Sequence, residues 1–328
     1  MTTDHRDAAG DPLASRLAAM KRGVEKMIPV PAGHREPRLG VTEAAHQLGC
    51  DEHLVELLVA AGLPAEPGPQ GPLFDYHDVM NLGLTSGTGR SVAELGERSC
   101  MRLATGKPQS WTATRNWRVR LAASVAGSPE AVVAPLPPAP KVLGGELVEW
   151  QPEIDGPGTA EARLTTQGSV DSPRTDAVRD IHDQLLDELA TGVYQYGWIP
   201  GTLRADPRTA LAHRMADCVV SAWLMRERAQ EAGLRARTRK GFLLGLIGVE
   251  HAWTEVYEEG RWLVLDPVLA YLGGRQRNTA AEFADFCRGS VHNRVLAWDR
   301  TAEEPLADHV PTNGERILVD CRPLPLAD

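Results

Sequence analysis

Three residues in the second half of the chain could together carry out acyl-transfer chemistry: Cys218, His251 and Asp266. Asp217 precedes an apolar run, Val219 to Met225, that is typical of a buried helix, so it is the predicted N-cap and Cys218 lies in the first turn. The free N–H groups and the dipole of a helix N-terminus favour a thiolate, the nucleophilic form of cysteine. Taken alone, a helical cysteine is more often a small buried packing residue.

The histidine and the aspartate belong to a predicted β-hairpin. The stretches 251–257 and 261–265 are rich in β-forming residues, and Glu258-Glu259-Gly260 between them offers a glycine for a tight turn. A hairpin folded about Glu258-Glu259 places His251 opposite Asp266, or one residue away if the loop contains a bulge. This register predicts a carboxylate that orients the imidazole and sets its tautomer. The alternative is two unrelated polar residues at strand ends.

A helix that starts at a cysteine, followed by GLRARTRKGFLLG and then HAWTEVYEEGRWLVLDP, resembles the transglutaminase-like core of the papain-like thiol enzymes. The resemblance covers roughly Thr165 to Leu272. It implies that Cys218 is the nucleophile, that His251 is the general base and acid, and that Asp266 orients His251. The implied fold is α+β, with the cysteine-bearing helix packed on an antiparallel sheet. The chain departs from the family at one position, because Ala216 stands where the family commonly has glycine.

Such a site would work through a thioester on Cys218, with an amine or water as the second nucleophile. The candidate oxyanion donors are the backbone N–H of Cys218 and the side chains of Gln195 and Trp198, although residues 194–198 could equally be ordinary aromatic packing. Tyr196 and Trp253 are candidates to line a substrate groove. We expect no cofactor and no metal, because no acidic loop has calcium-binding spacing.

Composition is compatible with an enzyme of the reducing cytoplasm. The chain has 328 residues, and 44 acidic residues against 35 basic ones give a formal charge of −9, which argues against binding of nucleic acid through overall charge. No apolar run is long enough for a membrane helix, and the start of the chain lacks the apolar core of a signal peptide. Five dispersed cysteines without a Cys-x-x-Cys pair indicate neither a disulfide framework nor a zinc site.

The first half predicts a different domain. We expect a flexible tail over residues 1–36, a domain over 37–126, a Pro-rich linker over 127–145 and the transglutaminase-like domain over 146–328. Within residues 37–82, Thr42 is the predicted cap of one helix and Asp51 of the next, before a Pro/Gly-rich wing and a third helix. This arrangement is similar to the winged helix-turn-helix of excisionase and MerR-type proteins.

Relatives of that type commonly place the second helix in the DNA major groove. Here that helix, at residues 51–58, contains three acids and no Lys or Arg, so phosphate contacts are unfavourable. We therefore expect these residues to recruit a peptide or protein substrate, or to serve as a structural accessory domain. Two other classes stay open for the whole chain: a non-catalytic module that holds a peptide in a transglutaminase-like groove, and a DNA-associated regulator.

Basic residues alternate with Trp111 and Trp117 between Arg98 and Arg120. This pattern could stack on bases or clamp a phosphate. The favoured interpretation is a surface segment whose tryptophans pack inward.

Overall fold

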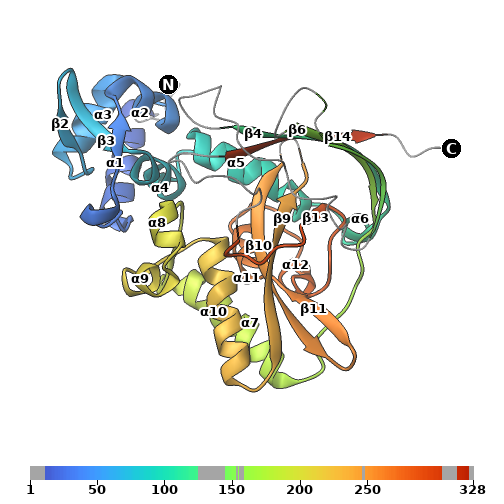
Figure 1. Ribbon diagram of the computed structural model, residues 1–328. Helices are drawn as coiled ribbons and strands as arrows, with labels where there is room; N and C mark the ends of the chain where they lie inside the picture. Colours follow the sequence, from blue (N-terminus) through green and yellow to red (C-terminus); the bar gives the residue numbers. More distant parts are fainter. Residues whose placement is uncertain are drawn as a thin grey trace, which may run out of the picture. The chain divides into compact units, whose positions relative to one another are not determined.

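The computed structural model describes residues 12–124, 145–152, 154, 159–245, 248–304 and 316–324 (Figure 1). The chain divides into two compact units. The first combines the residues up to Glu97 with the segment Gln195–Met215, and the second combines residues 98–194 with those from Ala216 onward. The chain therefore leaves the first unit, builds part of the second, returns to the first and leaves it again.

The first unit consists of short helices and a three-stranded antiparallel sheet of order β1-β3-β2. Its elements are α1 (Pro12–Lys26), a 3-10 turn (Ala32–His34), β1 (Pro37–Leu39), α2 (Val41–Leu48), α3 (Glu52–Ala60), β2 (Glu66–Gly68), β3 (Gly71–Asp75), α4 (Tyr76–Ser86), α5 (Val92–Cys100, which continues into the second unit), β7 (Gln195–Tyr196), α8 (Gly201–Arg204), α9 (Pro207–Ala212) and β8 (Met215–Ala216). The two helices, hairpin and third helix expected over residues 37–82 thus form as α2, α3, β2–β3 and α4.

Of the two N-caps predicted for this unit, one is confirmed and the other is wrong. Asp51 caps α3 as predicted, its carboxylate accepting the N–H of Leu54 at 2.9 Å. Helix α2 begins earlier than predicted, with Gly40 as its N-cap, and the Glu43 carboxylate accepts the Gly40 N–H at 2.6 Å. Thr42, the predicted cap, instead donates its hydroxyl to Glu52.

The prediction of a tail over residues 1–36 is wrong for its described part, because residues 12–26 form α1. Met20, Val24 and Met27 recur at helical spacing, and Met20 is fully buried in the core of the first unit. Polar residues lie between these three apolar positions, so the composition of the segment does not indicate an amphipathic helix.

The segment Gln195–Met215 is joined to the rest of the first unit by polar contacts as well as by packing. The Gln195 amide accepts the N–H of Ile28 at 2.5 Å and donates to the Lys26 carbonyl at 3.1 Å, just after α1 ends. Asn81 of α4 accepts the N–H of Trp198 at 2.7 Å and donates to the Trp198 carbonyl at 2.9 Å. These pairs join residues that lie more than a hundred positions apart in the sequence.

The second unit contains two antiparallel sheets with helices beside them (Figure 1). Its elements are a 3-10 turn (Met101–Leu103), α6 (Gln109–Thr112), β4 (Arg115–Ser124), β5 (Gly145–Pro152), β6 (Thr159–Thr166), α7 (Asp176–Thr191), α10 (Cys218–Glu231), β9 (Arg235–Leu243), β10 (Val249–Glu258), β11 (Arg261–Leu265), α11 (Pro267–Gly274), α12 (Phe283–Phe286), β12 (Arg288–Gly289), β13 (Val295–Ala297) and β14 (Arg316–Leu324). The strand orders are β12-β11-β10-β9-β13 and β14-β4-β6-β5.

The two sheets share a core. Alternate residues of β4, namely Trp117, Val119 and Leu121, are buried together with Phe242 of β9 and Trp298. Helix α10 packs on β9 and β10 of the five-stranded sheet. This confirms the expected combination of a cysteine-bearing helix with an antiparallel sheet.

The predicted boundary at residue 126 is wrong, because β4 pairs with β6 and β14 and so belongs to the second unit. Trp111 and Trp117 are 3% and 2% exposed, so both pack inward as favoured from the sequence. The predicted linker over 127–145 lies outside the described residues apart from its last position, where β5 begins.

Candidate active site

Helix α10 begins at Cys218, as the sequence predicts. The Asp217 carboxylate accepts the N–H of Val220 at 2.9 Å, which makes Asp217 the N-cap. Cys218 is 8% exposed and is the first residue of the helix, where backbone N–H groups have no partner within the helix. Ala216 is absent from the residues with positive φ, so this position does not need the conformational freedom of glycine.

The hairpin of β10 and β11 turns through two residues. Glu258 pairs with Arg261, and the loop between them is Glu259-Gly260, with φ of 47° and 87°. Positive φ at both central residues is the geometry of a type I′ turn, whose twist matches that of the flanking strands. Gly260 therefore adopts the left-handed conformation expected from the sequence, and Glu259 adopts it as well.

The predicted register is wrong, although the predicted contact is present. The last pair of the hairpin is Thr254 with Leu265, so His251 lies beyond β11 and opposite Gly241 of β9. Asp266 follows the end of β11 and caps α11, its Oδ1 accepting the N–H of Leu269 at 2.9 Å. From this cap, and not from a cross-strand position, the carboxylate reaches the histidine.

His251 and Asp266 form a short buried pair. The distance from His251 Nε2 to Asp266 Oδ2 is 2.6 Å, and the two residues are 7% and 5% exposed. Since Nε2 faces the carboxylate, Nδ1 is the ring nitrogen left for Cys218, and Cys218 is one of the neighbours that raise the pKa of His251. The structure therefore places Cys218 near the hydrogen-bonded pair of His251 and Asp266.

The charges of these residues favour an ionised pair. Burial on its own lowers the pKa of His251, but the charge and hydrogen bond of Asp266, together with the contact with Cys218, raise it to about 10. Burial raises the pKa of Asp266, yet the charge and hydrogen bond of His251 and the Leu269 N–H hold it below its usual value. The arrangement stabilises an imidazolium beside the cysteine, which is the setting that activates a thiol.

Two neighbours hold the histidine strand in place. The Thr254 hydroxyl of β10 donates to the Ala222 carbonyl of α10 at 2.8 Å, which ties the strand of His251 to the helix of Cys218. The Trp253 ring stacks near the imidazole, with ring centroids 6.2 Å apart and planes at 29°. The sequence suggested that Trp253 lines a substrate groove. Its side chain is only 2% exposed, so it supports the site from the interior instead.

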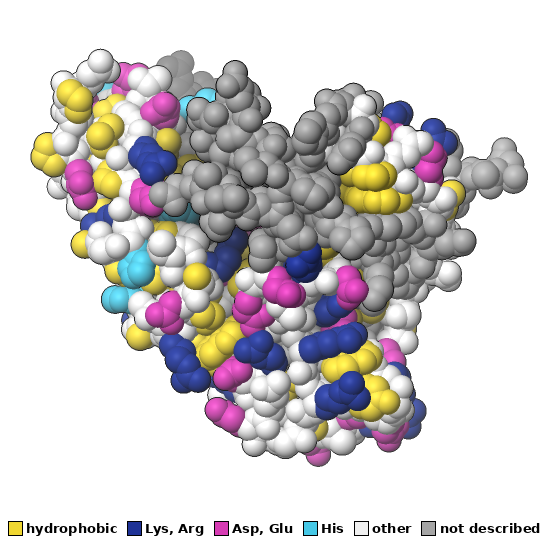
Figure 2. All heavy atoms as spheres, in the orientation of Figure 1, with side chains coloured by type: hydrophobic (Ala, Val, Ile, Leu, Met, Phe, Trp, Pro, Cys, Tyr) yellow, Lys and Arg dark blue, Asp and Glu magenta, His cyan; other side chains and the backbone are white. Residues whose placement is uncertain are grey.

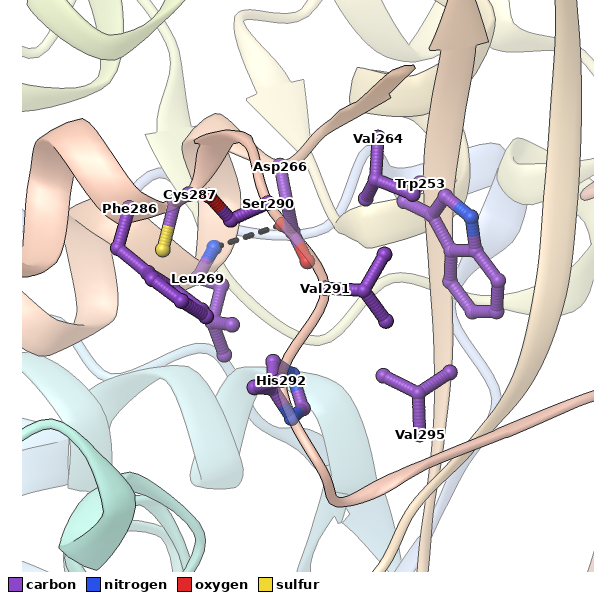
Figure 3. Close-up of a pocket in the computed structure, with 10 residues that line it drawn as sticks. All are labelled: Trp253, Val264, Asp266, Leu269, Phe286, Cys287, Ser290, Val291, His292 and Val295. Atoms are coloured by element: carbon purple, nitrogen blue, oxygen red, sulfur yellow. Dashed lines mark hydrogen bonds between the residues drawn. The ribbon is translucent and has the colours of Figure 1, made fainter. Parts of the chain in front are cut away.

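A second histidine, His292, lines the same small space as Asp266, and no sequence motif indicated it. Figure 3 shows His292 and Asp266 among ten side chains around a space of about 10 Å³, no larger than a single water requires. His292 Nδ1 accepts the N–H of Arg294 at 3.2 Å, and burial lowers the pKa of His292 to about 3. His292 is therefore a neutral imidazole beside the charged pair. Only its position in the fold, not a motif, reveals it.

The other predicted site residues lie in the first unit. The two polar atoms of the Gln195 amide bond to the backbone next to α1, as described above. Trp198 is 38% exposed, and its ring meets Tyr76 edge-on with centroids 6.2 Å apart. Tyr196 is half-buried in β7. All three positions thus belong to the unit formed with α1 and α4.

Comparison with known proteins agrees with this geometry. Residues 162–267 match the model of the transglutaminase-like superfamily. The transglutaminase-like region so defined contains Cys218, His251 and Asp266. It extends from β6 to the first residue of α11, and therefore includes the helix, the hairpin and the cap that form the site. None of the curated proteins matches the chain significantly.

Two solved structures are similar to parts of the chain. One is a candidate cysteine protease from Cytophaga hutchinsonii, with 12% identity, a TM-score of 0.35, and coverage of 66% of this chain and 93% of the other. The second is described as a TGase, with 13% identity, a TM-score of 0.24, and coverage of 42% and 47%. Both TM-scores are below 0.5, so the assignment depends on the superfamily match and on the site.

Among the described residues, no helix is long and apolar enough to cross a membrane, and no group of three His, Cys, Asp or Glu side chains is placed to hold a metal ion. On the face drawn in Figure 2, basic side chains lie beside acidic ones and do not gather into one basic patch.

Proposed function

We propose that the protein is a thiol enzyme that moves or hydrolyses an acyl group through a thioester on Cys218. The proposal is carried by the buried group of Cys218, His251 and Asp266, in which Cys218 is the first residue of α10. Asp266 stabilises an imidazolium at His251, which prepares His251 to take the proton of the Cys218 thiol. A thiolate is thereby available without an external base.

The chemistry follows from this proton position. Cys218 Sγ forms a bond to the carbonyl carbon of an amide, ester or thioester, and the carbonyl oxygen takes the negative charge. The Cys218 backbone N–H, which has no acceptor among the described residues, supports that charge. The bond to the leaving group then breaks as His251 transfers its proton to that group, which leaves a thioester and a neutral imidazole.

A second nucleophile completes the cycle. Neutral His251 removes a proton from an amine or from water as it attacks the thioester carbonyl. Collapse expels the Cys218 thiolate and restores the imidazolium, with a new amide from an amine or a carboxylic acid from water. Asp266 keeps Nε2 protonated throughout, so Nδ1 exchanges the proton in both halves of the reaction.

Alkylation with iodoacetamide tests the proposal. Cys218 should react fastest of the described cysteines although it is buried, because its thiolate is stabilised by His251. Cys50 is the internal control: it is more exposed, but burial is the main cause that raises its pKa to about 11. His251→Ala should slow modification of Cys218 by at least about tenfold, measured by peptide mass spectrometry.

If Cys218 reacts no faster than Cys50, or is indifferent to His251→Ala, the enzyme proposal fails. Intact mass spectrometry with activated esters provides the second readout. We expect one acyl adduct, and its absence from Cys218→Ala would locate it.

We also propose that residues 37–82 recruit a peptide or protein substrate and do not bind DNA. In support, Asp51, Glu52 and Glu56 on α3 are exposed, and α3 contains no Lys or Arg. An acidic face repels phosphates. In gel shifts with duplex DNA across a salt series, we expect no retardation even at low salt; retardation that weakens as salt rises would favour the regulator instead.

A further inference from the structure

The second unit contains a second cavity, with a volume of about 190 Å³. It is lined by Arg102, Leu103, Gly106, Ser110, Trp111, Arg115, His292, Asn293 and Arg294. His292 borders both this cavity and the small space that Asp266 lines.

Three arginines face this cavity and no acid does. Arg102, Arg115 and Arg294 contribute to its wall, and no Asp or Glu is part of the lining. In the described part of the chain none of the three forms an ion pair, and Arg115 Nε is buried without a hydrogen-bond partner. Burial and the charges of Arg115 and Arg102 lower the pKa of Arg294. The three cations therefore repel one another around an open space.

Three other polar side chains of the wall already have partners. The Trp111 indole N–H donates to the Leu103 carbonyl at 2.8 Å, and the Ser110 hydroxyl donates to the Lys107 carbonyl at 2.7 Å. The Asn293 amide donates to the Ser110 carbonyl at 3.0 Å. Most of the donors left for a ligand therefore belong to the guanidinium groups, which match the oxygens of phosphate and carboxylate.

We propose that this cavity binds an anionic group, a phosphate or a carboxylate. In the part of the chain that the structure describes, the three arginines form no ion pair, and a bound anion would offset the repulsion among them. Because His292 borders both this cavity and the small space lined by Asp266, the anion would lie on the Asp266 side of the proposed triad.

Isothermal titration of the full-length protein at constant ionic strength, with inorganic phosphate in one series and succinate in the other, tests the site. We expect saturable binding of at least one anion, and the tighter one identifies the class of the group. Arg115→Gln and Arg294→Gln should each weaken binding by at least about tenfold. Arg118→Gln is the matched control, because Arg118 lies on the same strand but pairs with Glu161 at the surface, and it should bind like the wild type.

Arg102→Gln adds a variant at the exposed edge of the cavity, should either buried change impair folding. If neither anion binds saturably, or if all three cavity variants bind like the wild type, the proposal is overturned. Cys218→Ala separates the two proposals, since it should keep anion binding while it abolishes the acyl adduct. Anion binding in a wild-type protein that forms no adduct would support the anion site and count against acyl transfer.

Discussion

At the scale of single residues, the site depends on a carboxylate with two roles. One oxygen of Asp266 accepts from the histidine and the other accepts the Leu269 N–H that caps α11. The cap fixes the carboxylate before any substrate arrives, so the imidazole meets a preset acceptor. The same residue therefore joins the stability of a helix to the proton position at the site.

Asp266→Asn keeps the cap and the volume but removes the charge. The raised pKa of His251 contributes stability that is fully present below 6.5 and is lost as pH rises through about 10, while the lowered pKa of Asp266 contributes stability that is present above 3.8. Both contributions are fully present between pH 3.8 and pH 6.5, and in this window we expect the variant to lose about 3 kcal/mol of unfolding free energy.

Urea denaturation at a series of pH values measures this loss. The difference between variant and wild type should shrink as pH rises toward about 10. A difference that does not change with pH would show that the pair is not ionised.

The hairpin pattern and the family resemblance were sufficient to propose Cys218, His251 and Asp266 as a triad, whereas residue types alone were not. They were insufficient for His292 and the arginine cavity, because Arg102, Arg115 and Arg294 come together only when a 3-10 turn, β4 and the start of β13 meet. Arg102 and Arg115 do belong to the basic segment considered as a phosphate clamp. Nothing in the chain indicated that a third arginine, far along the sequence, completes the group.

At the scale of elements, the hairpin shows how a correct contact can follow from an incorrect register. The sequence indicates a turn near Glu258 and Gly260, but the left-handed conformation of Glu259 moves the centre of the turn by one residue. A turn shifted in this way changes every cross-strand pair. The contact of His251 with Asp266 survives because the aspartate is on a helix cap, where it no longer depends on strand pairing.

The helices and the hairpin of residues 37–82 were predicted in order, since each has a local signal such as Asp51 at a cap or glycines at a turn. The assignment of residues 195–215 to that unit could not be predicted. Their contacts with α1 and α4 include hydrogen bonds between backbone groups and the side-chain amides of Gln195 and Asn81, and such bonds leave no regular spacing in the sequence.

At the scale of the whole molecule, one asparagine links distant parts of the first unit. Asn81→Leu keeps the volume but leaves the N–H and carbonyl of Trp198 without partners, so we expect a loss of about 3 kcal/mol in the stability of that unit. Amide hydrogen exchange should then accelerate together in α4 and in residues 195–215, while α7 and α10 keep their protection.

Gln184→Leu is the control, because Gln184 bonds only to Glu188 at an exposed position of α7. Faster exchange confined to α4, with residues 195–215 unchanged, would refute the assignment of the two segments to one cooperative unit.

The path of the chain through the first unit restricts how this architecture can be recombined. Because Gln195–Met215 belongs to that unit and ends just before Cys218, a single crossover in the gene cannot exchange one unit for another. A chimaera needs three junctions, after Glu97, before Gln195 and after Met215, and the last of them lies beside Cys218. The first unit is therefore inherited together with the residues that lead into α10, and we expect the two to diversify as one block and not as interchangeable modules.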